Sequence, residues 1–242
     1  MNTLTLNIHA VPFRMPDSLA EVRLFSTDVT DYTHADLAKL NELLSDEECA
    51  KVKRYRQKKD KLLSVVARGN LRRLLGKQLR QSPQSLIIGK GVHGKPQLEN
   101  TNTYVDFNVS HAGSKVLVAV DQSEERATQR ESHLGIDIEK VNPLVDIQII
   151  AKYYFSDREL YLINQSPEPA TTFFIYWTRK EALLKAAGVG LVDELSKVDV
   201  SKSQTVVAPT GERASLVSGT FDLWTFTDIN GYIVSLALKE VS

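Results

Sequence analysis

Two short segments of the sequence carry acidic side chains at spacings that suit chemistry on a phosphate. In the first, residues 135–139, Asp137 and Glu139 alternate with isoleucines, so an extended strand would turn both carboxylates to one face. Neighbouring carboxylates repel each other unless a cation neutralises them, and such oxygen ligands suit Mg²⁺, with Mn²⁺ as an alternative. The competing interpretation is a solvated polar face of a strand.

The second segment, residues 177–187, has the composition of a helix. Trp177, Glu181 and Lys185 stand at positions i, i+4 and i+8, and they therefore share one helix face. A surface pair of Glu181 and Lys185 would contribute only about 0.3–0.5 kcal/mol and need have no function. Because the indole of Trp177 belongs at the edge of a core, we expect this face to border a cleft instead.

Ser110 and His111 follow a strand pattern, at a point where the chain turns. Both side chains can donate to a phosphate, whereas adjacent Ser and His have poor geometry for a nucleophile and its base. The sequence also has no GxSxG nucleophile elbow. Ordinary turn chemistry is the structural alternative for this pair.

Basic residues crowd the stretch from 51 to 73, and a further lysine, Lys95, stands in the turn Gly94-Lys95-Pro96. Ser64, Arg68 and Arg72 would form one stripe of a helix. Charge runs of this kind are usually solvated faces, and the acids at 42–48 balance part of it. The alternative is that these basic residues form a binding surface for an anion.

Composition limits the function classes. The chain has 242 residues, of which 42% are apolar and 25% charged, as in a soluble globular protein of one large or two small domains. Thirty basic residues balance thirty acidic ones, which argues against nucleic-acid and polybasic membrane partners. No apolar run reaches the length of a membrane span, and no signal peptide is evident. The single cysteine, Cys49, predicts a cytoplasmic location.

The periodicity predicts an α+β protein with antiparallel sheets. The polar stretch 121–133 is predicted to be a linker between two halves. Elsewhere we expect extended segments within 1–30, helices beginning near 36 and 45, a helix over 60–79, strands over 105–110 and 115–120, a strand over 134–141, a helix over 170–187, and a hairpin at Asn230-Gly231.

In this order the motifs resemble those of the Sfp-type 4′-phosphopantetheinyl transferases. The matching segments are Gly94-Lys95-Pro96, Phe107-Asn108-Val109-Ser110-His111, the segment 135–139 and the segment 177–185. The resemblance implies two similar α+β halves related by a pseudo-twofold, with the active site in the cleft between them. Residues 1–125 would bind the nucleotide and phosphates of coenzyme A, and residues 126–242 would bind Mg²⁺ and carry catalysis.

The resemblance also implies the reaction. A serine hydroxyl of an apo acyl or peptidyl carrier protein attacks the β-phosphate of coenzyme A, and adenosine 3′,5′-bisphosphate leaves. Asp137, Glu139 and Glu181 match the metal ligands of the family. Glu181 or a metal-bound water is the implied base, and Lys185 matches the lysine at the reacting phosphate. A chain of this size is expected to work as a monomer.

The same resemblance implies which residues hold coenzyme A. They are Lys51, Ser64, Arg68, Lys95, Ser110 and His111. Glu48 departs from the pattern, because a relative would offer a lysine there, and Arg68 or Arg72 is expected to replace that contact. Glu159 matches a frequent acidic position, but it also fits a capping box with Ser156. Two functions remain as alternatives, a Mg²⁺-dependent phosphodiesterase or nuclease and a non-catalytic coenzyme A-binding protein.

Overall fold

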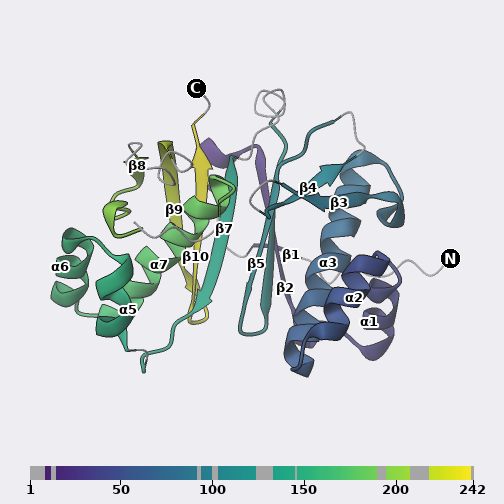
Figure 1. Cartoon of the computed structure of the whole chain (residues 1–242), viewed down its shortest axis with the longest axis horizontal. Coiled ribbons are helices and arrows are strands. Elements are labelled where there is room, and N and C mark those ends of the chain that lie inside the picture. The colour runs from purple at the N-terminus through teal and green to yellow at the C-terminus, as the bar shows by residue number, and fades with distance from the viewer. Residues whose placement is uncertain are drawn as a thin grey trace.

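A computed structural model describes residues 9–11, 15–91, 94–99, 103–123, 133–144, 146–189, 195–207 and 218–240. Two sheets stand next to each other in the middle of the molecule, with helices on the two outer sides (Figure 1). The helices are α1 (His34–Asn41), α2 (Asp46–Arg54), α3 (Lys58–Leu79), α5 (Ile147–Tyr154), α6 (Asp157–Gln165) and α7 (Pro169–Ala186). The strands are β1 (His9–Ala10), β2 (Val22–Asp28), β3 (Ile87–Lys90), β4 (Pro96–Glu99), β5 (Phe107–Ala112), β6 (Lys115–Asp121), β7 (Leu134–Lys140), β8 (Gln204–Val207), β9 (Gly219–Ile229) and β10 (Tyr232–Lys239).

The sheet of the first half is antiparallel, with the strand order β1-β2-β6-β5. Residues alternate along β6, so that Val118 and Val120 pack with Leu71 of α3, whereas Leu117 faces the second sheet. The helix α3 matches the helix predicted over 60–79, and α2 begins at the predicted capping box of Ser45 with Glu48. A helix near 36 is confirmed by α1.

The sheet of the second half is also antiparallel, with the strand order β7-β10-β9-β8. Asn230 (φ 50°) and Gly231 (φ 80°) connect β9 to β10. Two consecutive positive φ angles are those of a type I′ turn, which confirms the predicted hairpin. The helix α7 covers the outer face of this sheet and confirms the helix predicted over 170–187.

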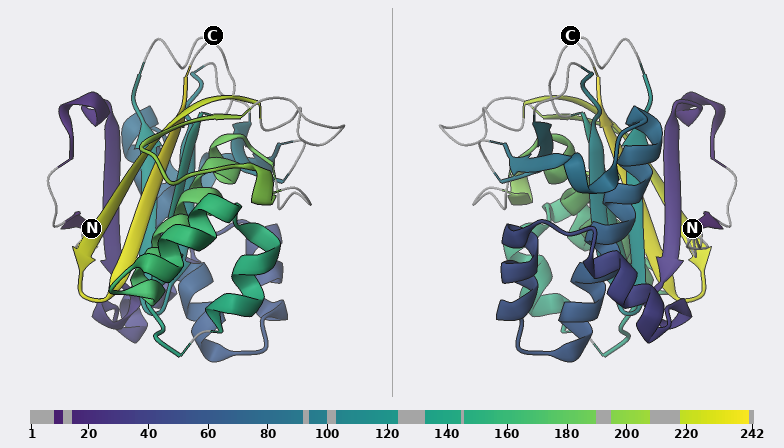
Figure 2. Two further views of the ribbon diagram at one scale, coloured as in Figure 1. Left: turned by 90° about the vertical axis from the view of Figure 1, so that its left-hand side faces the viewer. Right: turned by 90° about the vertical axis from the view of Figure 1, so that its right-hand side faces the viewer.

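The two sheets pack on each other in the middle of the molecule, and each carries its long helix on the outside (Figure 2). Between the sheets lies a core to which both halves contribute, including Leu24 and Leu117 from the first and Ile136 and Leu236 from the second. Each half is thus one four-stranded antiparallel sheet with one long outer helix. This confirms the predicted α+β class with two similar halves.

Some segments differ from the predictions or lie beyond them. The predicted turn Gly94-Lys95-Pro96 leads into a small two-stranded sheet that was not among the predicted elements, in which β3 pairs with β4 from Ile87–Glu99 to Lys90–Pro96. The helix α5 was not among the predicted elements. Residues 1–8 and 124–132, which include an expected extended segment and most of the predicted linker, lie outside the described residues. None of the described helices combines the length and apolarity of a membrane span.

Candidate active site

The acidic strand β7 and the helix α7 meet at a glycine. A Cβ built on Gly135 would lie 1.9 Å from the carbonyl oxygen of Ala182 and 2.5 Å from the amide nitrogen of Ala186. No side chain fits there, so the residue at 135 must be glycine for the strand and helix backbones to approach this closely. The close approach brings Asp137, two residues further along β7, against Lys185 of α7.

Lys185, Asp137 and Ser110 form one hydrogen-bonded cluster that joins the two halves. The Nζ of Lys185 lies 2.6 Å from Oδ1 of Asp137, and it also donates to Oγ of Ser110 at 3.1 Å. The hydroxyl of Ser110 donates to the same Oδ1 at 2.8 Å. Three residues that were predicted from separate motifs therefore converge at one point.

Glu139 and Glu181 lie close enough to interact electrostatically with Asp137 and Lys185. We call Asp137, Glu139 and Glu181, with Lys185 and Ser110, the acidic cluster. Burial, together with the charges of Asp137 and Glu181, raises the pKa of Glu139 to about 7, against the opposing effect of Lys185. Burial and the charge of Asp137 also raise the pKa of Glu181. Partly buried acids that repel one another in this way favour a cation or a proton.

The donor set fits a divalent metal ion that also binds the substrate. Oδ2 of Asp137 is buried, and no hydrogen-bond donor among the described residues reaches it. A buried carboxylate oxygen of this kind needs a partner. In the described part of the chain, no three His, Cys, Asp or Glu side chains converge closely enough to hold a metal by themselves. An incomplete set suits Mg²⁺, which usually takes one or two carboxylates plus phosphate oxygens and waters.

A cavity opens on the first half directly beside this cluster. Four of the predicted coenzyme A residues line it: Lys51, Ser64, Arg68 and His111. Other residues that line it are Tyr55, Ala67, Pro96, Phe107, Asn108 and Val109. Burial lowers the pKa of His111, and the charge of Lys185 lowers it further. The charges of Lys185 and Asp137 also act on His111, so the basic cavity and the acidic cluster adjoin there.

The departure at Glu48 has a structural explanation. Oε2 of Glu48 accepts a 2.7 Å hydrogen bond from Nε of the buried Arg72, whose Nη1 donates to the carbonyl oxygens of Pro83 and Leu86. Arg72 is therefore buried in the first half, and its guanidinium is already bound by protein groups. Arg68 lies 3.9 Å from Oε1 of Glu48 and remains at the cavity wall. Of the two arginines expected to replace the missing lysine contact, Arg68 is the one whose position suits it.

Two predicted coenzyme A residues, Ser110 and Lys95, are not part of the cavity lining. Ser110 lies in the cluster with Asp137 and Lys185, whereas Lys95 lies in neither place. Its Nζ lies 2.9 Å from Oδ1 of Asp106 and donates to the carbonyl oxygen of Leu134 at 2.6 Å. Pro96, the next residue, does line the cavity.

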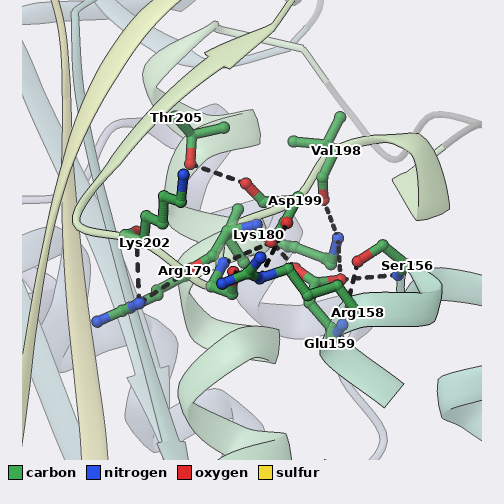
Figure 3. A network of polar contacts seen from close by, with 11 residues as sticks. Ser156, Arg158, Glu159, Arg179, Lys180, Val198, Asp199, Lys202 and Thr205 are labelled. Atoms are coloured by element: carbon green, nitrogen blue, oxygen red, sulfur yellow. Dashed lines mark hydrogen bonds and ion pairs between the residues drawn. The ribbon is translucent and has the colours of Figure 1, made fainter. Parts of the chain in front are cut away.

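A second buried ion pair fixes the orientation of α7 (Figure 3). Nζ of Lys180 lies 2.9 Å from Oε2 of Glu159, and both side chains are fully buried. Lys180 also donates to the carbonyl oxygens of Leu195 and Val198, and Glu159 accepts from the amide of Val200. The predicted capping box of Ser156 with Glu159 is confirmed, and the ion pair adds a structural role for Glu159.

Sequence reasoning missed Asp106, Asn108 and Lys180. The alternation on β5 indicates that Asp106, Asn108 and Ser110 share a face, but it does not show what lies opposite that face. Lys180 stands next to Glu181 in a motif whose pattern draws attention to the acid. A lysine beside buried apolar residues of a helix is a weak signal, because lysines usually lie in water.

Comparisons with known proteins agree with this geometry. A family model described as the 4′-phosphopantetheinyl transferase superfamily matches residues 133–237, and another described as 4′-phosphopantetheinyl transferase, N-terminal, matches residues 31–123. The 4′-phosphopantetheinyl transferase HetI of Nostoc sp. is 31% identical over 179 residues, which are 72% of each chain.

Two further relatives show the same resemblance. The L-aminoadipate-semialdehyde dehydrogenase-phosphopantetheinyl transferase of Schizosaccharomyces pombe is 31% identical over 61% of this chain and 60% of its own. The 4′-phosphopantetheinyl transferase Sfp of Bacillus subtilis is 28% identical over 66% of this chain and 67% of its own. The chain belongs to the 4′-phosphopantetheinyl transferase superfamily and is a phosphopantetheine transferase. The comparisons give no support to a nuclease, a phosphodiesterase or a non-catalytic binding protein.

Proposed function

We propose that this chain transfers 4′-phosphopantetheine from coenzyme A to a serine hydroxyl of an apo acyl or peptidyl carrier protein, with the residues described above in specific roles. One observation carries the proposal. The basic cavity adjoins the acidic cluster at His111, on which the charges of Lys185 and Asp137 act, so a diphosphate held by the cavity would extend toward the cluster. We expect the chain to act as a cytoplasmic monomer, without nucleic acid or membrane as partner.

The cavity residues Lys51, Ser64, Arg68 and His111 would hold the nucleotide phosphates of coenzyme A. Lys51 is exposed, whereas Arg68 and Ser64 are half-buried in the wall of the cavity. Cations on an open surface meet a polyanion without first losing a buried partner, and the neighbouring hydroxyl adds a donor. His111 is expected to donate to the 3′-phosphate.

Asp137, Glu139 and Glu181 would hold a divalent metal ion, Mg²⁺ or Mn²⁺, together with the diphosphate. Such an ion would neutralise the diphosphate and stabilise the charge that develops on the leaving phosphate. The buried Oδ2 of Asp137 and the raised pKa values of Glu139 and Glu181 support these three residues as its ligands.

Glu181 and Lys185 would act on the reacting groups. The serine oxygen of the carrier bonds to the β-phosphorus, and the bond from that phosphorus to the bridging oxygen of the α-phosphate breaks. Glu181, which the resemblance implies as the base, would take the proton of the hydroxyl. The half-buried amine of Lys185, held by Asp137 and Ser110, would contact the diphosphate and stabilise its negative charge.

The test is an incubation of the protein with coenzyme A, Mg²⁺ and several apo carrier proteins, followed by mass spectrometry of each carrier. We expect a gain of one phosphopantetheine, which disappears when the carrier serine is changed to alanine. No gain on any apo carrier would refute the proposed function. Hydrolysis of coenzyme A without transfer would instead indicate a phosphodiesterase.

A further inference from the structure

The strand β7 has an open edge in the middle of the molecule. It pairs with β10 on one side and is the end strand of its sheet among the described strands. In an antiparallel pair, every second residue directs its N–H and C=O to the neighbouring strand, and the residues between direct theirs outward. On β7 the outward residues include Leu134 and Ile136, both fully buried. Their backbone groups therefore need partners other than water.

Side chains supply all four partners. The amide of Leu134 donates to Oδ2 of Asp106 at 2.8 Å, and its carbonyl accepts from Nζ of Lys95 at 2.6 Å. The amide of Ile136 donates to Oδ1 of Asn108 at 2.9 Å, and its carbonyl accepts from Nζ of Lys185 at 3.2 Å. No strand of the first half forms a ladder with β7 in the described pairings, so these bonds take the place of one.

The contacts are in register with the active-site cluster. Asp106, which immediately precedes β5, reaches residue 134, and Asn108 on β5 reaches residue 136, so a step of two residues along this segment matches a step of two on β7. The two strands accordingly run side by side in the same direction (Figure 1). The next residue on this face of β5 is Ser110, whose hydroxyl donates to Asp137. Along this face, Asp106 and Asn108 therefore bind the backbone of β7, and Ser110 binds the side chain of Asp137 in the active site.

Lys95 is too enclosed for a ligand of an open cavity. Its side chain is 6% exposed and that of its partner Asp106 is 5% exposed. Oδ2 of Asp106 accepts from the amide of His133 as well as from that of Leu134. A phosphate that bound Lys95 would leave the carboxylate of Asp106 buried without its cation, which is strongly unfavourable.

We propose that Lys95, Asp106 and Asn108 are positioning residues, which hold the open edge of β7 to β5 and thereby keep Asp137 beside Ser110 and Lys185. Lys95 takes this role in place of the phosphate contact that the sequence predicts for it. The activity readout rests on the proposed function, because a displaced Asp137 changes the transfer step. A readout on the backbone of β7 does not depend on that function.

The first experiment compares coenzyme A with 3′-dephospho-coenzyme A as substrates. For Lys95→Met we expect kcat to fall at least tenfold, while KM for coenzyme A and the preference between the two substrates stay within about twofold of wild type. His111→Ala, from the cavity, is the contrast and should lose that preference. If Lys95→Met loses the preference as His111→Ala does, Lys95 is a phosphate ligand and the proposal is wrong.

The second experiment measures amide hydrogen exchange of the full chain without coenzyme A. Asn108→Ala should accelerate exchange at Ile136 at least tenfold and leave the amides of the β9–β10 pair within twofold. Unchanged exchange at Ile136 would overturn the proposal. Should Lys95→Met fail to fold, Lys95→Met with Asp106→Asn removes both charges of the ion pair and retains an acceptor. A wild-type chain that transfers to no carrier would refute the proposed function and leave the exchange result standing.

Discussion

The basic cavity of the first half and the acidic cluster of the second differ in how much water surrounds their charges. Lys51 at the cavity is exposed, whereas Asp137 is buried and Glu139 is half-buried. Burial raises the pKa of Glu139 and Glu181, and the charge of Asp137 adds to the rise in both. The cavity can therefore bind an anion as it stands, while the cluster requires a cation or protons. The comparison assigns binding mainly to the first region and chemistry to the second.

The largest expected effect comes from Glu181→Gln, which removes the base and one carboxylate from the cluster. We expect kcat for transfer to fall at least about 10³-fold, because general base catalysis contributes roughly 10²–10⁴. Coenzyme A binding, measured by isothermal titration calorimetry, should stay within about threefold of wild type, because the cavity is intact. Turnover near that of wild type would refute the role of Glu181 as the base. It would also argue against assigning the chemistry to the acidic cluster and the binding to the cavity.

Gly135→Ala should disturb the acidic cluster without touching the cavity. The new Cβ would meet the backbone of Ala182 and Ala186, so β7 and α7 must separate. We expect the free energy of unfolding to fall by about 3 kcal/mol or more, as measured by urea denaturation. Gly231→Ala is the matched control, because its Cβ has open space and only its positive φ (80°) opposes it, at about 1–2 kcal/mol. Equal losses in the two variants would contradict the close packing at Gly135.

Arg68→Ala should affect the cavity alone. Losing one hydrogen bond to a charged group costs about 1.5–3 kcal/mol, so KM for coenzyme A should rise about tenfold or more with little change in kcat. Lys59→Ala is the control, because it removes the same charge from an exposed position of the same basic stretch that does not line the cavity. If both variants raise KM equally, general attraction by the basic stretch would explain binding better than the cavity does.

The smallest expected effect is on stability and its dependence on pH. The pKa of Glu139 is raised from 4.5 to about 7 in the folded protein, so folding takes up protons in this range. The stability that this group contributes is present below pH 4.5 and is lost as the pH rises through 7. Glu139→Gln should therefore stabilise the metal-free protein at pH 8 by about 1–2 kcal/mol after allowance for solvent screening.

Thermal unfolding measures this effect, with an expected rise in Tm of about 2–4 °C for each kcal/mol. At pH 5 the two proteins should melt at nearly the same temperature. Added Mg²⁺ should stabilise the wild type at pH 8 more than at pH 6, because ligand carboxylates must lose their protons. A variant that is less stable than wild type at pH 8 would contradict the raised pKa of Glu139.

Much of the fold and of the site could be predicted from local patterns. The capping boxes at Ser45 and Ser156 and the turn at Asn230-Gly231 were predictable because their hydrogen bonds and φ angles involve residues at most three positions apart. His111 was recognised in a motif and Lys51, Ser64 and Arg68 by their position in the resemblance, and all four line one cavity. The partners of Lys95, Arg72 and Lys180 were not predictable, because each is set by which element packs against which.

The sequence by itself determined the element types, the alternation that turns Asp137 and Glu139 to one face of a strand, and the helix face that Glu181 and Lys185 share. These features depend on the geometry of single strands and helices, which repeats every two or 3.6 residues. Only the tertiary structure decided that Ser110 and Lys185 meet Asp137, and that Lys95 lies in a buried pair with Asp106. The physical reason is that an open strand edge takes its partners from whatever side chains the packing brings near it, and those lie up to 49 positions away in the sequence.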